Sequence, residues 1–240
     1  DIVHFYNLHN LGMSLAREAQ AAGKPTIYSF CNYWLLCPRL YLFGPDLALC
    51  DGPSADGGKC ARCLGRPELA ADYAKRYQRA LAVLDRDTDL VLAATRRVRE
   101  IYLRCGAPPG KVRVLQQKLE SLETIWAETG RDRAPVERLD RPLRIGFIGS
   151  LLPHKGIQVL VEALQLLPPG RVEAQLCGDV HPDYRHRLAQ LDRQGCCRFT
   201  GPYDPAALPD LLRRVDLVVI PSTWEEIGPL VTAEALAARC

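Results

Sequence analysis

Short apolar runs alternate with amphipathic stretches along the whole chain. In the first half, the runs that predict strands are "DIVHFYN", "PTIYSF", "DLVLAAT" and "KVRVLQ", and helical periodicity predicts helices over 11–22, 67–84 and 96–105. Strands separated by helices in this way are typical of β-α-β units, whose strands lie parallel in one sheet. The first half is therefore predicted to be an α/β domain.

The second half repeats this pattern independently. Strands are predicted at "LRIGFIGS", "VEAQLCGD", "CRFTG" and "VDLVVIPS", with helices over 183–193 and 205–213 between them and a last helix opening at Pro229. The helix that follows "LRIGFIGS" carries an apolar stripe at helical spacing, made of Ile157, Leu160, Val161, Leu164 and Leu167. Such a stripe predicts a helix that faces a core.

Residues 127–142, "AETGRDRAPVERLDRP", have no apolar periodicity and are predicted to link the two halves. We expect two Rossmann-like β-α-β domains that face a cleft, over 1–126 and 143–240, with the ligand at the carboxyl ends of the strands. The chain begins at Asp1 without a methionine and stops at Cys240 inside an expected helix. Both domains are therefore expected to be incomplete.

The composition limits the kinds of binding partner that the chain is expected to have. Of the 240 residues, 48% are hydrophobic and 25% charged, with a net charge of +3, which suits an anionic ligand better than nucleic acid. No apolar run approaches the roughly 18 residues of a membrane span, and no signal peptide opens the chain, so a cytoplasmic location is expected. The basic stretches "AKRYQR" and "TRRVRE" leave open a peripheral contact with the anionic inner membrane face.

Two acids near the end of the chain, Glu226 and Glu234 in "WEEIGPLVTAE", lie eight positions apart around a Gly-Pro break. Because proline is tolerated at the start of a helix but not inside, we place Glu226 in the loop after a strand and Glu234 inside the helix from Pro229. A carboxylate can accept hydrogen bonds from two adjacent hydroxyls, as in the recognition of a ribose or hexose. Solvated acids at a helix start are the alternative.

Several segments together resemble a known family. "GSLLPHKGIQVLVEAL", "LCGD", "FTGPYDPAALPDLLRRVDLVVIPS" and "WEEIGPLVTAEALA" are similar to the C-terminal half of the retaining glycosyltransferases of family 4, glycosyltransferase group 1, which have the GT-B fold. The first half resembles the later part of the family's N-terminal, acceptor-binding domain. The resemblance implies transfer of a sugar from a nucleotide-diphosphate sugar to a glycan, lipid or small-molecule acceptor, with retention of anomeric configuration.

The resemblance also implies roles for particular residues. Glu226 would contact and orient the donor sugar as the catalytic residue, Glu234 would contact the ribose, and Lys155 the diphosphate, with no cofactor required for transfer. The substrate-binding residues would be Gly149, Ser150, Lys155, Glu226, Gly228, Pro229, Leu230 and Glu234. Two positions depart from the family: Ser150 stands where an arginine is usual, and Cys31 and Asn32 stand where His-Asp is common.

Cysteines form a separate group in the segment 31–66. Cys60 and Cys63 make a CxxC pair, which lets two thiolates reach one tetrahedral zinc ion, and Cys37 and Cys50 can supply the other two ligands. A structural zinc would keep such an insert ordered, although it has little apolar content. Reduced, unligated thiols in an irregular loop are the alternative.

Other function classes stay open. The sequence has no Ser-His-Asp pattern, no Walker loop and no GxGxxG, which disfavours acyl transfer, NTP hydrolysis and dinucleotide redox chemistry. A relative that binds a nucleotide sugar or carbohydrate without turnover is the first alternative to a glycosyltransferase. A zinc-dependent interaction module is the second.

Overall fold

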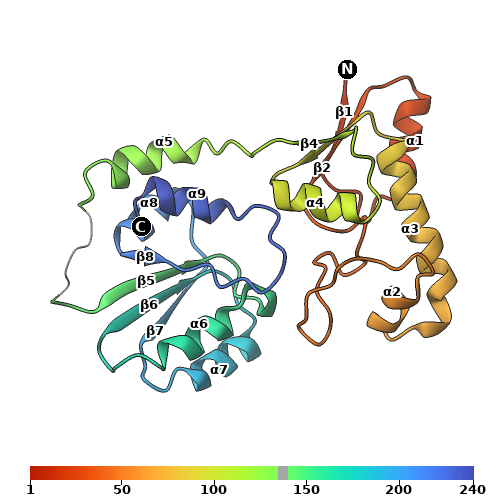
Figure 1. Ribbon diagram of the computed structural model, residues 1–240. Coiled ribbons are helices and arrows are strands. Elements are labelled where there is room, and N and C mark those ends of the chain that lie inside the picture. Colours follow the sequence, from red (N-terminus) through yellow and green to blue (C-terminus); the bar gives the residue numbers. More distant parts are fainter. Residues whose placement is uncertain (135–139) are drawn as a thin grey trace. The chain divides into compact units, whose positions relative to one another are not determined.

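The computed structural model describes residues 1–134 and 140–240, and the described chain divides into two compact units (Figure 1). The first unit consists of Asp1–Gln117 with Trp224–Gly228, and the second of Lys118–Thr223 with Pro229–Cys240. Within the described residues each unit contains one four-stranded parallel sheet, so the predicted α/β class is confirmed. No helix in the described part of the chain has the length and apolar character to cross a bilayer.

In the first unit the sheet order is β1-β2-β3-β4, formed by Val3–Phe5, Thr26–Phe30, Leu90–Ala93 and Val112–Val114. The connecting helices are α1 (Ser14–Ala21), α3 (Ala70–Asp85) and α4 (Arg96–Arg104). The threonine hydroxyl of Thr95 caps α4 by accepting from the Val98 amide at 3.2 Å. The Tyr102 ring of α4 then stacks on Phe30 of β2 with ring centroids 3.4 Å apart, so α4 is fixed on the sheet.

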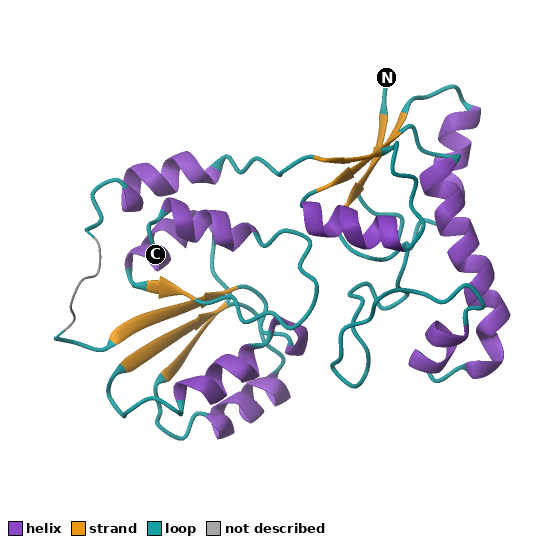
Figure 2. Cartoon of the chain, in the orientation of Figure 1, coloured by secondary structure: helices purple, strands orange, loops and turns teal. Residues whose placement is uncertain are grey.

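The segment between β2 and α3 is mostly loop, as Figure 2 shows. It contains one helix that periodicity did not predict, α2 (Gly58–Cys63), and a 3-10 turn, Pro67–Leu69, ahead of α3. "GKCARC" has too few apolar residues to show a helical stripe, which is why the sequence did not reveal α2. A Cβ at Gly57 would overlap the Ala70 carbonyl oxygen, so glycine lets α2 lie close against α3.

In the second unit the sheet order is β7-β6-β5-β8, and Figure 1 shows helices on both of its faces. The strands are Leu143–Ile148 (β5), Val172–Cys177 (β6), Cys197–Gly201 (β7) and Leu217–Val218 (β8). The helices are α5 (Ser121–Ile125), α6 (Ile157–Leu164), α7 (Pro182–Leu191), α8 (Leu208–Arg213) and α9 (Leu230–Ala237), with 3-10 turns at Pro153–Lys155 and Pro205–Ala207. One face packs against α6 and α7, and the other against α5, α8 and α9.

Three details of the second unit differ from the sequence predictions. Helix α6 ends at Leu164, so Leu167 lies beyond it and is 40% exposed rather than part of the core stripe. Trp126–Gly130 continue α5 as a π-helical turn where a linker was expected, because Gly130 packs tightly against the Ala237 carbonyl oxygen; residues 135–139 of that stretch lie outside the described residues. Helix α9 begins at Leu230, since Pro229 is extended, with ψ 109°.

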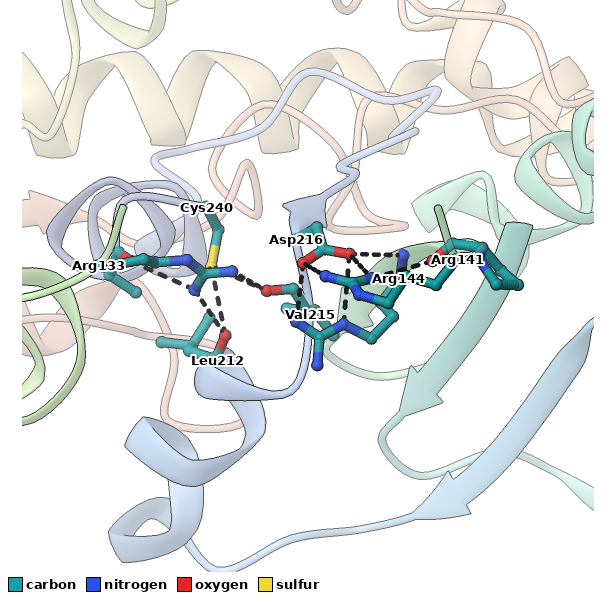
Figure 3. A network of polar contacts seen from close by, with 9 residues as sticks. Arg133, Arg141, Arg144, Leu212, Val215, Asp216 and Cys240 are labelled. Carbon is teal, nitrogen blue, oxygen red and sulfur yellow. Dashed lines mark hydrogen bonds and ion pairs between the residues drawn. The ribbon is translucent and has the colours of Figure 1, made fainter. Parts of the chain in front are cut away.

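A buried carboxylate joins the start of β8 to β5 (Figure 3). The Asp216 side chain is 1% exposed and accepts from Arg141 Nη1 and Nη2 at 2.7 and 2.9 Å. It also accepts from the backbone amide and the guanidinium of Arg144, at 2.9 and 2.8 Å. These donors hold the pKa of Asp216 well below its usual range. Beside it, Arg133 donates to the Leu212 and Val215 carbonyls, so the chain that leads into Asp216 is also held.

Replacing this carboxylate by an amide should destabilise the protein. We expect Asp216→Asn to lower the free energy of unfolding by about 2–4 kcal/mol at pH 7, because charge-assisted bonds to two arginines are lost from a buried position. Since the folded pKa of Asp216 is depressed, its contribution is complete above the unfolded pKa of about 4 and is lost as pH falls below it.

Urea unfolding of both proteins between pH 7 and pH 3 measures this effect. Asp210→Asn is the control, because Asp210 pairs with Arg213 while 63% exposed and should change stability little. Equal losses for both variants, or a gap that does not narrow in acid, would contradict a stabilising role of Asp216.

Candidate functional site

The strand order of the second unit defines where a ligand fits. From β5 the chain goes to β6 and β7 on one side of the sheet, and it later returns to β8 on the other side. Ligands of open α/β sheets bind outside the carboxyl ends of the strands at such a reversal. Here the reversal lies between β5 and β8, so its two loops are Gly149–Gly156 and Val219–Thr223.

Gly149 and Ser150 begin the first of these loops. The Gly149 amide donates to the Cys177 carbonyl at 2.9 Å, and its φ of +143° suits glycine alone. A Cβ at Gly178 would overlap the Gly149 carbonyl oxygen, so two backbones meet there without side chains between them. Ser150 is exposed directly beyond this contact, where its hydroxyl can meet a ligand.

Lys155 ends the 3-10 turn of the same loop and is half-buried. The next residue, Gly156, has φ +69°, and a Cβ there would overlap the Pro221 carbonyl oxygen of the loop after β8. Thr223 tightens the same junction, because its amide and hydroxyl both donate to the His154 carbonyl, at 3.0 and 3.2 Å. Lys155 is thus held at the switch point beside the first turn of α6, where helix amides add positive potential.

Glu234 lies in α9 of the second unit and is half-buried. Burial raises its pKa, and a hydrogen bond with the Ser121 side chain partly opposes the shift. The pKa of Tyr203, just after β7, is raised first by burial and then by the charge of Glu234. The carboxylate therefore lies within electrostatic reach of the carboxyl end of this sheet.

Glu226 belongs to the first unit, because the segment Trp224–Gly228 packs there. Ile227 is buried in that unit's core, and Glu225 forms an ion pair with Arg97 of α4. The indole Nε1 of Trp224 donates to Glu226 Oε1 at 2.8 Å, which orients the carboxylate. The two predicted acids therefore belong to different compact units.

The remaining motif residues flank this segment. A Cβ at Gly228 would lie 3.6 Å from the Ala94 Cβ and 3.7 Å from the Thr95 Cγ2, so the segment runs close over the start of α4. Pro229 caps α9, and Leu230, its first residue, is 45% exposed.

Tyr33 is a candidate that sequence reasoning missed. It is fully buried in the first unit, and its hydroxyl has no hydrogen-bond partner among the described residues. The Trp224 ring stands edge-on to it at 6.3 Å, and Glu225 and Glu226 add to the effect of burial in raising its pKa. A buried hydroxyl beside Glu226 with unused hydrogen-bonding capacity is a ligand-binding candidate. The only signal in the sequence was an aromatic residue just after a strand.

The departure at Cys31 and Asn32 has a local explanation. The Asn32 side-chain oxygen accepts from the Trp34 amide at 2.9 Å, and its carbonyl accepts from the Tyr102 hydroxyl at 3.0 Å. Asn32 thus shapes the turn after β2. Cys31 as a residue is exposed, but its thiol group is partly desolvated, which raises its pKa.

A second feature not predicted is a cavity of about 440 Å³ at the carboxyl ends of β6 and β7. Its lining includes Gly178, Asp179, Arg185, Gly201 and Pro202. Asp179 follows β6, a position where a side chain can touch a ligand but where turns also favour aspartate. The lining gives this unit hydrogen-bond donors and acceptors beside the Gly149 loop.

The four predicted zinc ligands, Cys37, Cys50, Cys60 and Cys63, line one cavity of about 380 Å³ in the first unit. Burial, and after it the thiols of Cys37, Cys50 and Cys63, raise the pKa of Cys60 to about 11.

A different group of possible metal ligands is closer together. Among the described residues, the group whose ligand atoms all lie within 4.8 Å of one another consists of Asp192, Cys196 and Cys197. There the carboxylate already accepts from the two cysteine amides at 3.0 and 2.9 Å, so it caps a turn.

Comparison with known proteins shows which family the second unit resembles. Residues 142–240 match the family model described as glycosyl transferases group 1. The match covers β5 to α9, including Lys155 and Glu234. The resemblance read from the sequence to glycosyltransferase group 1 is thereby confirmed.

The similar curated proteins are glycosyltransferases. The chain is 37% identical over 125 residues to D-inositol 3-phosphate glycosyltransferase of Corynebacterium glutamicum. This alignment covers 45% of this chain and 29% of the relative. It is 28% identical over 221 residues to alpha-D-kanosaminyltransferase of Streptomyces kanamyceticus, covering 80% of this chain and 56% of the relative. The chain thus spans less than two thirds of each relative.

Solved structures confirm the GT-B fold. Anabaena HepE in complex with UDP and glucose matches 99% of this chain and 57% of its own with a TM-score of 0.66 at 20% identity. Sucrose-phosphate synthase of Thermosynechococcus elongatus matches 99% of this chain and 54% of its own with a TM-score of 0.61 at 19% identity. At these identities the likeness establishes the fold alone.

The close approach at Gly156 can be tested with a matched glycine. Gly170 has a similar φ, +75°, but open space around it, so Gly170→Ala is expected to cost about 1–2 kcal/mol from left-handed backbone alone. Gly156→Ala should cost clearly more, because it also displaces the Pro221 loop. Chemical unfolding of both variants measures the difference, and equal losses would mean that the contact with Pro221 does not hold the switch point together.

Proposed function

We propose that the protein is a glycosyltransferase that takes a sugar from a nucleotide-diphosphate donor and passes it to an acceptor with retention of anomeric configuration. The observation that carries this proposal is the position of Lys155 at the β5/β8 switch point, beside the first turn of α6 and fixed by Gly156 and Thr223. A diphosphate needs positive charge and oriented amides at such a position.

Lys155 and the α6 amides would serve both donor binding and the breaking of the sugar–phosphate bond. When the bond between the sugar and the diphosphate breaks, negative charge grows on the leaving phosphate. Lys155 and the α6 amides stabilise that charge. Ser150, exposed in the same loop, can add a hydrogen bond but no charge, unlike the arginine usual in the family.

The two acids take separate roles. Glu226, oriented by the Trp224 indole, accepts hydrogen bonds from hydroxyl groups of the donor sugar. The Tyr33 hydroxyl, which has no hydrogen-bond partner among the described residues, lies within electrostatic reach of Glu226. Glu234 accepts the two ribose hydroxyls of the nucleoside. The cavity lined by Gly178 and Asp179 suits the base of the nucleoside.

UDP is the first nucleotide to try. HepE was solved with UDP, with UDP-glucose, and with UDP and glucose, and its fold matches nearly all of this chain. This supports a nucleotide-sugar donor, and the geometry of the switch point agrees with it.

An anionic acceptor suits the first unit. A groove of about 890 Å³ lies along α1 and α3 and is lined by basic side chains, namely Arg17, Lys75, Arg76, Arg79 and Arg86, together with Asp72 and Asp87. A phosphate-bearing sugar or polyol would pair with these guanidinium groups. The name of the inositol 3-phosphate relatives agrees with such an acceptor.

A binding protein without turnover is the second candidate. Cys31 and Asn32 replace the family's common His-Asp, and the Asn32 side chain is already engaged in a turn. An activity assay distinguishes the glycosyltransferase from the binding protein. The protein is incubated with UDP-glucose in the presence of inositol phosphates and simple sugars, and the release of UDP is measured. Binding of UDP-glucose without release of UDP to any acceptor or to water would favour the second candidate.

The diphosphate loop is tested by changing its charge in both directions. Lys155→Ala should weaken UDP binding about ten- to a hundredfold, the loss expected for one charge-assisted contact. Ser150→Arg should tighten it, because it adds a cation at the same loop. Isothermal titration calorimetry measures both, with Lys118→Ala, an exposed lysine outside the loop, as the control. Unchanged affinity in both loop variants would exclude this loop as the diphosphate site.

The two acids should respond differently to two ligands. Glu234→Gln is expected to weaken UDP and UDP-glucose alike, roughly ten- to a hundredfold, because the nucleoside is common to both. Glu226→Gln should weaken UDP-glucose while leaving UDP nearly unchanged, because its partner is the sugar. The same titrations decide this. A Glu234 that only supports α9 would lower the melting temperature and leave both affinities alone.

A further inference from the structure

We propose that Cys37, Cys50, Cys60 and Cys63 bind one structural Zn²⁺ ion that holds the segment between β2 and α3 in place. These cysteines come from three places along 27 residues of chain, yet all four line the same cavity of about 380 Å³. Four thiols around one cavity are the ligand set that a tetrahedral zinc site requires.

The secondary structure presents each pair. Cys60 and Cys63 are three residues apart in α2, so they share one helix face. Cys37 lies just after the buried residues that follow β2, with its amide donating to the Tyr33 carbonyl at 2.7 Å. Cys50 is placed by its amide, which donates to the Leu42 carbonyl at 2.8 Å. The zinc would therefore connect the loop 37–50 to α2.

The loop needs such a connection because its own structure is weak. From residue 38 to 57, the described structure contains an isolated bridge, Phe43 to Leu49, and neither a helix nor a strand. Three of its leucines, Leu40, Leu42 and Leu47, have left-handed backbone, with φ of 74°, 48° and 63°. Leucine adopts that conformation at an energetic cost and keeps it only where the surroundings enforce it. A metal cross-link at both ends of this loop supplies that constraint.

The surrounding charge also suits a thiolate site. Zinc with four thiolates is net negative, so it needs nearby cations when it is partly buried. Arg39, Lys59 and Arg62 line the same cavity, where Asp46 is the acid among the lining residues. Arg76 of α3 also interacts electrostatically with Cys37 and Cys60.

Zinc binding should also contract the site. In the described structure no three of these sulfurs lie within 4.8 Å of one another. Zn–S bonds of about 2.3 Å in tetrahedral geometry bring sulfurs to roughly 3.8 Å apart. We therefore expect the metal to draw the loop 37–50 towards α2, so that metal loss loosens this segment and leaves the second unit unaffected.

Elemental analysis of the purified chain tests the proposal directly. About one zinc per chain is expected. Cys60→Ser and Cys63→Ser should each lower the zinc content severalfold, whereas Cys31→Ser and Cys196→Ser, which change cysteines outside the set, should retain it. Full zinc content in the first two variants, or loss in the Cys196→Ser control, would overturn the assignment.

A second measurement covers variants that fail to fold. Wild-type protein stripped with a chelator and given Co²⁺ should show the strong thiolate-to-cobalt absorption of a four-sulfur tetrahedral site, and stripping should lower its melting temperature. Iron with acid-labile sulfide in place of zinc would mean a cluster and overturn the proposal, since such clusters use the same ligands. Metal-free protein whose melting temperature a chelator does not change would overturn it as well.

Discussion

The pairing of the short strand β8 with β5 is the constraint on which the candidate nucleotide site depends. Only two register pairs, Ile145 with Leu217 and Gly146 with Val218, join these strands in the described residues. So short a strand needs stabilising contacts at both ends. At its start the buried carboxylate of Asp216 binds the two arginines before and in β5, and at its far end the Gly156 and Thr223 contacts close the loops together. The switch point exists because both ends are held.

Missing side chains shape this site as much as present ones. At Gly149, Gly156 and Gly178 the backbones of neighbouring loops approach to distances that a Cβ would prevent, or take dihedral angles that other residues avoid. Under the proposed function, this loop would meet the diphosphate with backbone amides and with the side chains of Ser150 and Lys155. A loop of this kind recognises phosphate by charge and amides, which explains how the relatives can share a fold while acting on different acceptors.

Much of the fold was readable from local pattern because each unit buries its sheet on both faces. The last four residues of β5 are all buried, β6 begins with alternating apolar and polar residues, and the α6 stripe follows helical spacing through Leu164. The failures concern long-range packing. The helical turn at Trp126–Gly130 is stabilised by a contact with Ala237, more than a hundred residues away, and the burial of Tyr33 depends on the insert and on the Trp224 segment. No local pattern encodes either contact. The sequence pattern assigns the whole stretch from Trp224 to Glu234 to 143–240, whereas Trp224–Gly228 belong to the first compact unit.

The two acids of that motif also differ in how a ligand would act on them. Glu226 already accepts the Trp224 indole N–H on one oxygen, and a carboxylate has capacity for several donors, so its orientation is set before any sugar arrives. Glu234 is different, because burial raises its pKa and so favours the neutral acid. Under the proposed function, ribose hydroxyls that donate to this carboxylate stabilise its charged form and lower that pKa. Nucleoside binding and ionisation of Glu234 then support each other. An acid that is costly to keep charged without a ligand gains most from one that supplies two donors, which favours the nucleoside as the partner of Glu234.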